Sequence, residues 1–160
     1  MPDDTPCMVE YDTAQAILTA ALNRLLHDRV ETVTPLQACG RVSAEDVQAR
    51  SPRPEVDISA MDGYALRLGE MQQAGAAGLP VRGYVAAGTR PAPLAAGVAS
   101  EILTGARIPD GADCVVARER TALVSGHVVL AEGVTAKPGM NIRRAGEEFS
   151  AGQCLLERGK

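Results

Sequence analysis

Aromatic residues are scarce in this sequence, which has three Tyr, one Phe and no Trp among 160 residues. Proteins that bind single-stranded nucleic acid stack the bases on aromatic side chains, and this chain has few rings for that purpose. Hydrophobic residues still make up 46% of the composition, so we expect a core of Ala, Val, Leu and Ile. The length suits one modest domain or two small ones.

Positive charge is also limited, since the formal net charge is -4, the pI is near 5.2 and only two residues are Lys. Binding to phosphate backbones depends on a clustered excess of Lys and Arg, so we expect no nucleic-acid partner. The four cysteines stand far apart, without a Cys-x-x-Cys pair, which argues against a structural zinc site. We interpret all four as free thiols: Cys7, Cys39, Cys114 and Cys154.

Long apolar runs are missing too, because no stretch reaches the roughly 20 residues that a membrane span requires. The N-terminal residues lack the basic start and the apolar stretch of a signal peptide. We therefore expect no membrane partner and a cytoplasmic location.

Residues 12–30 carry the clearest helical period in the chain. Apolar residues recur there at the i, i+3, i+4 and i+7 spacing, which predicts an amphipathic helix. The apolar stripe consists of Ala14, Ile17, Leu18, Ala21, Leu22, Leu25 and Leu26. The surface that packs against this stripe could belong to this chain, to a second copy or to a further C-terminal part, and the sequence leaves these alternatives open.

Short apolar runs between Gly- and Pro-rich turns dominate residues 61–120 and predict β-structure. We expect strands at 64–68, 81–86, 100–103 and 114–119, a flexible loop at 74–78 and a hairpin that turns at Ser125 and Gly126. A helix of about one turn is expected after Thr34, followed by extended chain at 41–49. Several short strands at near-regular spacing favour a small barrel or sandwich.

Asp62 stands between small and flexible residues, where a loop becomes a predicted strand. Its carboxylate is expected to be exposed, and Gly63 permits backbone angles that other residues resist. The simplest interpretation is an Asp that hydrogen-bonds to its own turn. Thr104, at the end of another apolar run and directly before a Gly, could likewise only close its own turn. Asp113 is expected to play a structural role in a turn.

Three motifs favour a different interpretation when they are taken together: Ser-Ala-Met-Asp-Gly-Tyr-Ala (59–65), Thr-Gly-Ala-Arg-Ile-Pro-Asp-Gly-Ala-Asp-Cys-Val-Val (104–116) and Asn-Ile-Arg-Arg-Ala-Gly-Glu (141–147). In this order, the chain from about Tyr11 to Lys160 resembles the N-terminal region of the molybdopterin molybdenumtransferases, the family of MoeA and gephyrin. The resemblance implies an α+β fold, in which an N-terminal helix and an elongated α/β piece carry an inserted small β-barrel-like domain. The implied division is 1–49 for the helix and the start of the elongated linker and dimerisation domain, 50–137 for the barrel-like domain and 138–160 for the return segment.

The resemblance further implies an enzyme of molybdenum cofactor biosynthesis that inserts molybdate into adenylylated molybdopterin, with Mg²⁺ as the metal. It implies a homodimer whose active site lies between the barrel-like domain of one subunit and a large C-terminal molybdopterin-binding domain of the other. We expect that large domain to be missing here or to be a separate chain, so that this segment alone is inactive. The alternatives are a non-catalytic dimerisation element and a gephyrin-like scaffold or binding module.

Carried over motif by motif, the resemblance makes Asp62 and Thr104 the catalytic candidates. Asp62 would hold the metal or a metal-bound water, because a carboxylate and molybdate repel each other. The Thr104 hydroxyl would donate to a phosphate or molybdate oxygen. Arg143 and Arg144 would clamp anionic groups of the cofactor, with Glu148 beside them.

Three observations keep other interpretations open. Glu147 and Glu148 follow closely on Arg143 and Arg144, so a surface ion-pair network would explain the two arginines equally well. The family usually has Asp at the position of Glu148. In addition, the stretch before Asp62 is shorter than is usual in the family, which could alter the geometry of the loop.

Overall fold

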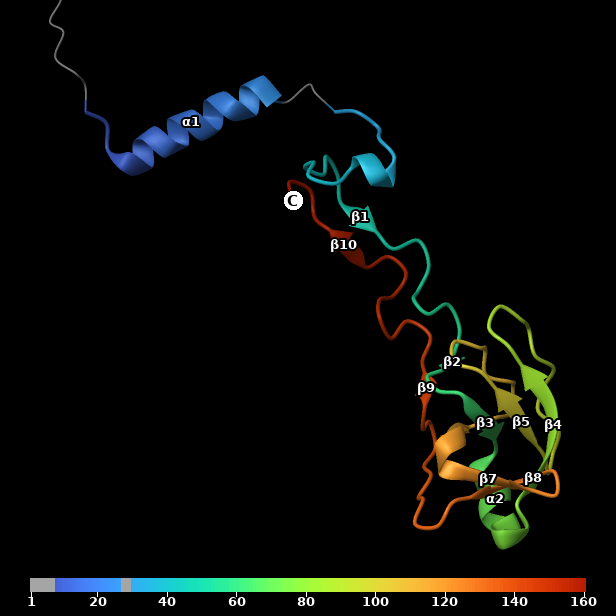
Figure 1. Ribbon diagram of the computed structural model, residues 1–160. Coiled ribbons are helices and arrows are strands. Elements are labelled where there is room, and N and C mark those ends of the chain that lie inside the picture. Colours follow the sequence, from blue (N-terminus) through green and yellow to red (C-terminus); the bar gives the residue numbers. More distant parts are fainter. Residues whose placement is uncertain (1–7, 27–29) are drawn as a thin grey trace, which may run out of the picture. The chain divides into compact units, whose positions relative to one another are not determined.

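The computed structural model describes residues 8–26 and 30–160, which Figure 1 colours along the sequence. Cys7 and residues 27–29 of the predicted first helix lie outside the described residues. The chain divides into two compact units, which are described separately. The N-terminal unit comprises Met1–Val47 with Leu156–Lys160, and the sheet unit comprises Gln48–Leu155.

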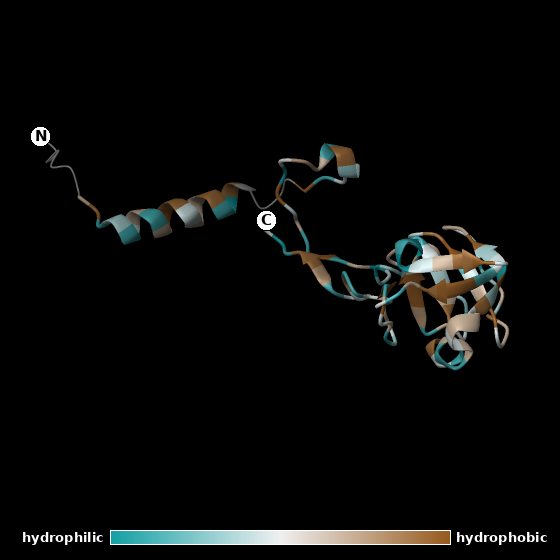
Figure 2. Cartoon of the chain, turned by 60° about the horizontal axis from the view of Figure 1, so that its bottom comes forward, coloured by the Kyte–Doolittle hydropathy of each residue, from teal (hydrophilic) through white to brown (hydrophobic). Residues whose placement is uncertain are grey.

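The N-terminal unit begins with helix α1 (Tyr11–Leu26), which confirms the predicted helical period. Brown and teal residues, hydrophobic and hydrophilic, alternate around this helix in Figure 2. Four side chains of the apolar stripe are more than half exposed: Ile17, Leu18, Leu22 and Leu25. In the described part of the chain, no helix is long and apolar enough to cross a membrane.

A short helix, η1 (Pro35–Gln37), follows Thr34 at the predicted place. The side-chain oxygen of Gln37 accepts hydrogen bonds from the backbone N–H and the hydroxyl of Thr34, at 3.2 and 2.8 Å. Within the expected extended stretch, two residues form β1 (Val47–Gln48), which pairs with β10 (Cys154–Leu156).

The sheet unit contains a curled sheet of six strands in the order β6-β3-β5-β4-β8-β7 (Figure 1). Neighbouring strands are antiparallel, except for the parallel pair β4 and β5. The strands are β3 (Gly63–Leu66), β4 (Leu79–Val85), β5 (Ala99–Ile102), β6 (Cys114–Ala117), β7 (Thr121–Val124) and β8 (His127–Leu130). Two further short strands, β2 (Ile58–Ser59) and β9 (Ile142–Arg143), pair with each other. The fold is therefore a mixture of helix and sheet.

The predicted hairpin is confirmed, because β7 and β8 pair around Ser125 and Gly126. Both turn residues have positive φ, 49° at Ser125 and 80° at Gly126. Positive φ at both central positions is typical of the type I′ turn, whose twist matches that of the flanking strands. A Gly adopts this conformation without steric cost, which explains Gly126 at the second turn position.

Two expectations for residues 64–78 were wrong. The strand expected to reach Leu68 ends at Leu66, and the expected flexible loop is occupied by the end of α2 (Leu68–Ala74) and by η2 (Gly75–Ala77). The helix buries Leu68 and Met71 in the core of the sheet unit. So short a helix carries a single repeat of the apolar spacing, and the period alone did not separate it from a strand.

Asp113 anchors this helix to the strand region. Its carboxylate accepts a hydrogen bond from the backbone N–H of Leu68 at 2.8 Å, which satisfies one of the free donors in the first turn of α2. This contact agrees with the structural role expected for Asp113. A smaller difference concerns the strand expected at 114–119, since β6 ends at Ala117 and η3 (Arg118–Arg120) follows it.

The core of the sheet unit is aliphatic, as the composition predicts. Its first cluster includes Leu66, Met71, Leu79, Val116 and Val128, and its second includes Ala65, Val85, Ile102 and Val115. Successive residues of β3 and of β6 enter different clusters, because side chains alternate across a strand. Both faces of these two strands are therefore buried, and the candidate site lies at the end of this strand pair.

Candidate active site

Asp62 stands directly before β3, after a loop whose shape depends on the buried Ser59. The Ser59 hydroxyl donates to the backbone oxygen of Met61 at 2.6 Å. The backbone N–H of Ser59 donates to Ala106, and its C=O accepts from Gly105, at 2.9 and 2.8 Å. These bonds tie the loop before β3 to the loop that follows β5.

Gly63, the first residue of β3, is required by close backbone packing. A Cβ built on Gly63 would lie 2.1 Å from the backbone oxygen of Val116, far inside the normal contact distance. Gly63 is not one of the glycines with positive φ in the described chain, so lack of space explains it, rather than the unusual backbone angles expected from the sequence. The close approach of β3 and β6 holds Asp62 at the end of the sheet.

The structure brings Asp62 and Thr104 into direct contact, although 42 positions separate them in the sequence. The Thr104 hydroxyl and the Thr104 backbone N–H both donate to Asp62 Oδ1, each at 2.7 Å. Both residues are exposed, so a ligand can reach the pair. Neither side chain merely closes its own turn, which was the simplest interpretation of each.

The contacts of Asp62 favour its ionised form. The side-chain and backbone hydrogen bonds from Thr104 lower the pKa of the Asp62 carboxyl below its usual value, and the positive charge of Arg118 lowers it further. A carboxylate with a lowered pKa is a poor proton acceptor but a suitable ligand for a metal or for a metal-bound water. The site is thus better suited to positioning than to general base catalysis.

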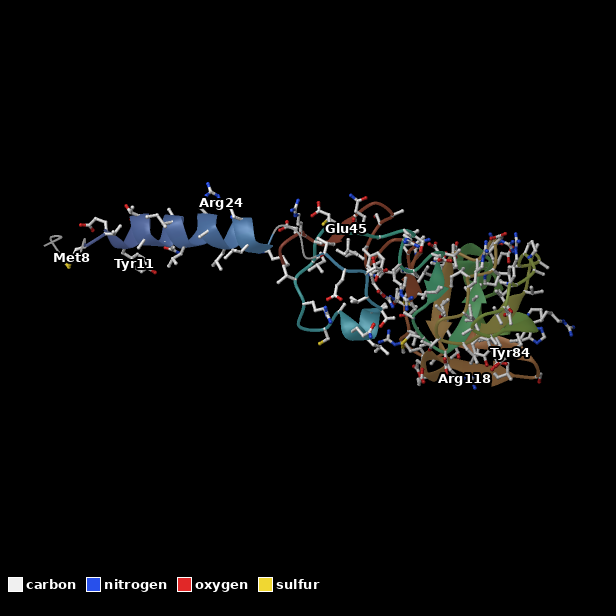
Figure 3. All side chains as sticks on the ribbon, turned by 90° about the horizontal axis from the view of Figure 1, so that it is seen from above. Met8, Tyr11, Arg24, Glu45, Tyr84 and Arg118 are labelled. Carbon is white, nitrogen blue, oxygen red and sulfur yellow. The ribbon has the colours of Figure 1, made fainter. Side chains whose placement is uncertain are left out.

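Arg118 is a neighbour of Asp62 that the sequence analysis missed. Its backbone N–H donates to the backbone oxygen of Asp62 at 3.0 Å. Its guanidinium forms an ion pair with Glu101, with Nη2 2.5 Å from Oε1. Arg118, labelled in Figure 3, follows an ordinary apolar strand, and no local pattern distinguishes it. Only the register of β3 against β6 identifies it.

Arg143 and Arg144 belong to an ion-pair network within the described residues. Arg143 Nη2 lies 2.5 Å from Glu148 Oε1, and this hydrogen bond and charge raise the pKa of Arg143. Arg144 Nη1 lies 2.5 Å from Asp57 Oδ2. A surface ion-pair network of this kind is the alternative to cofactor binding that the sequence left open for Arg143 and Arg144.

Asp57 links this network to the backbone at Ala145. Its Oδ1 accepts a hydrogen bond from the backbone N–H of Ala145 at 2.9 Å. Partial burial opposes ionisation of Asp57, yet this bond and Arg144 hold the pKa of its carboxyl below the usual value. A cavity of about 430 Å³ opens beside it, lined by Asp57, Ala145, Arg107 and neighbouring residues but not by Asp62 or Thr104.

The described residues hold no cluster of three or more His, Cys, Asp or Glu side chains that could bind a metal by itself. Asp62 therefore offers one carboxylate ligand. This is compatible with Mg²⁺, which proteins often hold through one or two carboxylates, substrate phosphates and water.

A comparison with protein families matches residues 9–160 to the MoeA N-terminal region, domains I and II. The match extends over nearly the whole chain and includes the site described above. The chain therefore belongs to the MoeA N-terminal region family.

Curated relatives agree with this assignment. The chain is 39% identical to the molybdopterin molybdenumtransferase of Haemophilus influenzae, in an alignment that covers 77% of this chain. It is 35% identical to the molybdopterin molybdenumtransferase of Synechococcus elongatus, in an alignment that covers 96% of this chain. Gephyrin of Dictyostelium discoideum is 30% identical over 95% of the chain. The chain spans only 30%, 38% and 23% of these three relatives, respectively.

The fold also has a solved counterpart. A molybdopterin biosynthesis MoeA protein from Pyrococcus horikoshii superimposes with a TM-score of 0.70 at 34% identity. The superposition covers 88% of this chain and 39% of that protein.

Proposed function

We propose that this chain is the N-terminal part of a molybdopterin molybdenumtransferase, which inserts molybdate into adenylylated molybdopterin during molybdenum cofactor biosynthesis. The observation that carries the proposal is the exposed contact between Asp62 and Thr104, at 2.7 Å, in a chain of the MoeA N-terminal region family. The chain spans about a third of the similar transferases, so most of the catalytic machinery belongs to the remainder of such an enzyme. This segment alone is inactive under the proposal.

Asp62 is the proposed positioning group for Mg²⁺ or for a metal-bound water. The metal would supply Lewis acid chemistry at the phosphoanhydride and would neutralise the charge of molybdate. Thr104 keeps the Asp62 carboxylate ionised and oriented through its two hydrogen bonds. Arg143, Arg144 and Glu148 are the proposed cofactor-binding groups, and the two arginines would exchange carboxylate partners for the phosphate of the cofactor.

The finer architecture is part of the same proposal. Residues 50–137 would form the barrel-like domain, inserted between 1–49 and 138–160 of an elongated α/β domain. Two copies would form a homodimer in the cytoplasm, and a C-terminal molybdopterin-binding domain or chain would complete each active site. The solvent-exposed apolar side chains of α1 support a partner of this kind, because such side chains are usually covered in a complete assembly.

A second candidate is a scaffold or dimerisation role without catalysis. The similarity to a gephyrin and the exposed apolar stripe of α1 favour it. In that case the contact between Asp62 and Thr104 would be structural only.

Replacement of Asp62 in a complete enzyme that contains this chain separates the two candidates. Asp62→Asn keeps the size of the side chain and lowers molybdate insertion by about 10²-fold or more if the carboxylate positions a reacting group. The measurement is molybdenum cofactor formed from adenylylated molybdopterin and molybdate, together with the thermal melting curve. Asp110→Asn is the matched control, because the Asp110 side chain is 75% exposed and its ion-pair contact, with Arg107, is as long as 4.0 Å. Equal activity of the Asp62 and Asp110 variants would contradict catalysis at this site.

A further inference from the structure

Asp62 and Arg118 are cross-strand neighbours at one end of the sheet. In the antiparallel pair of β3 and β6, Gly63 lies opposite Ala117, and Tyr64 lies opposite Val116. Continuing this register by one residue places Asp62 opposite Arg118, and a backbone hydrogen bond of 3.0 Å joins them. Side chains directly opposite in an antiparallel pair share one face, with Cβ atoms about 5 Å apart.

One end of the Arg118 guanidinium is held in place. Its Nη2 lies 2.5 Å from Glu101 Oε1, on β5, the strand on the other side of β3. Among the described residues, Nε and Nη1 of Arg118 have no hydrogen-bond acceptor, and the side chain is 51% exposed. A planar guanidinium with unused donors can bind two oxygens of one anion at once.

The charges around Asp62 show why a cation is needed there. Asp62 is ionised, so it repels molybdate and phosphate alike. The basic residue whose charge lowers the pKa of Asp62 is Arg118. Arg118 has a carboxylate partner, as Arg143 and Arg144 do. It differs from these two arginines because its charge acts on Asp62.

We propose that Arg118 binds a tetrahedral oxyanion beside Asp62, while Glu101 holds one nitrogen of its guanidinium. The oxyanion is molybdate or the phosphoryl group of an adenylylated substrate, two sources with the same chemistry. This choice of ligands rests on the proposed function. The arrangement brings an anion next to a carboxylate that would otherwise repel it, while two hydrogen bonds from Thr104 hold that carboxylate in place.

Titration of the full 160-residue chain with anions, followed by amide NMR shifts, tests the proposal. Molybdate and inorganic phosphate are added in separate experiments, with chloride used to keep the ionic strength constant, because screening alone changes surface electrostatics. We expect saturable shifts at Asp62, Thr104 and Arg118. Tighter binding of molybdate indicates the metal oxyanion as the ligand, and tighter binding of phosphate indicates the phosphoryl group.

Three variants locate the binding group. Arg118→Gln removes the positive charge and the planar set of N–H donors. It should raise the dissociation constant of the oxyanion about tenfold or more, as loss of a charge-assisted hydrogen bond implies. Arg118→Lys keeps the positive charge but not the planar set of donors, so it should give a dissociation constant between those of the wild type and the Gln variant. If the Gln variant unfolds, the Lys variant still tests whether Arg118 binds the oxyanion. Arg120→Gln is the matched control, since it removes the same charge from the same turn, η3, and should leave binding unchanged.

The proposal is overturned if the wild-type chain shows no saturable shifts, or if the Arg118 and Arg120 variants weaken binding equally. Its failure is distinct from failure of the proposed function. Loss of molybdate insertion in Asp62→Asn, without anion shifts in the chain, would reject the Arg118 subsite alone. Anion shifts at Arg118, combined with full activity of Asp62→Asn, would reject the catalytic role of Asp62 alone.

Discussion

Thr104 donates two hydrogen bonds to a single oxygen of Asp62, one from its hydroxyl and one from its backbone N–H, each at 2.7 Å. Two donors on Oδ1 fix the rotation of the carboxylate. Within the described residues, Oδ2 has no hydrogen-bond donor, so one oxygen is oriented by the protein and the other is available to a ligand.

The first prediction concerns the hydroxyl of Thr104. Thr104→Val keeps the shape and the backbone N–H but removes the larger cause of the lowered pKa, so the pKa of Asp62 should rise toward its usual value. The folded pKa is depressed, so the contribution of Asp62 to stability is present above the usual carboxyl range and is lost as the pH falls through the folded pKa. Carboxyl NMR titration of the chain measures the change. Thr104→Ser, which keeps a hydroxyl, is the control, and an unchanged pKa in the Val variant would show that the hydroxyl has no influence.

The second prediction concerns the space around Gly63. Gly63→Ala places a methyl group 2.1 Å from the backbone oxygen of Val116, so β3 must shift away from β6. We expect the free energy of unfolding to fall by at least about 2 kcal/mol. Urea denaturation measures this change.

Gly69→Ala is the control for Gly63→Ala. Gly69 lies within α2, and a Cβ on it would meet no atom within 4 Å. Because Ala is the better helix former, this variant should be more stable than the wild type by up to about 1 kcal/mol. Similar effects of the two Ala substitutions would mean that backbone entropy, and not close packing, decides both.

The third prediction concerns the thiol of Cys114. Burial, followed by the charge of Asp113, raises the pKa of Cys114 to about 12. The thiolate is the reactive form, so Cys114 should resist alkylation in the folded chain. Exposed Cys39 should react readily, and mass spectrometry with and without denaturant distinguishes the two. Alkylation of both at equal rates without denaturant would show that the strand β6 opens easily.

A pH dependence follows from the same thiol. A free thiol in the unfolded chain ionises near pH ~8.5, well below the folded pKa. The stabilising effect of the buried thiol is therefore complete below that pH, and it is lost progressively as the pH rises toward about 12. Replacement by Ala should flatten the fall in stability above pH ~8.5.

The fourth prediction concerns the ion pair of Asp57 with Arg144. Asp57→Asn removes the charge, and because both side chains are partly exposed, the loss in unfolding free energy should be only about 0.5–1 kcal/mol. The difference from wild type should shrink at about 1 M salt, because salt screens exposed charges. Urea denaturation at low and high salt tests both points. Asp110→Asn should change stability less, and a salt-independent loss in Asp57→Asn would mean that the charge of the ion pair with Arg144 does not account for its effect.

Local patterns were sufficient for several elements. The period of residues 12–30 predicted α1, and Ser125 with Gly126 predicted the hairpin, because helix spacing and turn chemistry act over a few residues. Leu68 and Met71 show the limit of this approach. Their helix, α2, is too short for a period, and part of its stability comes from Asp113, which is distant in the sequence.

In the candidate site, too, the sequence determined some features and the tertiary structure decided others. The sequence by itself determined which residues stand at the loops before β3 and after β5, and their motifs singled out Asp62 and Thr104. The tertiary structure alone decided that these two share a hydrogen-bonded oxygen, that Gly63 is needed for lack of space and that Arg118 lies opposite Asp62. The physical reason is that strand register sets these contacts, and register follows from burial of whole strand faces rather than from any short segment.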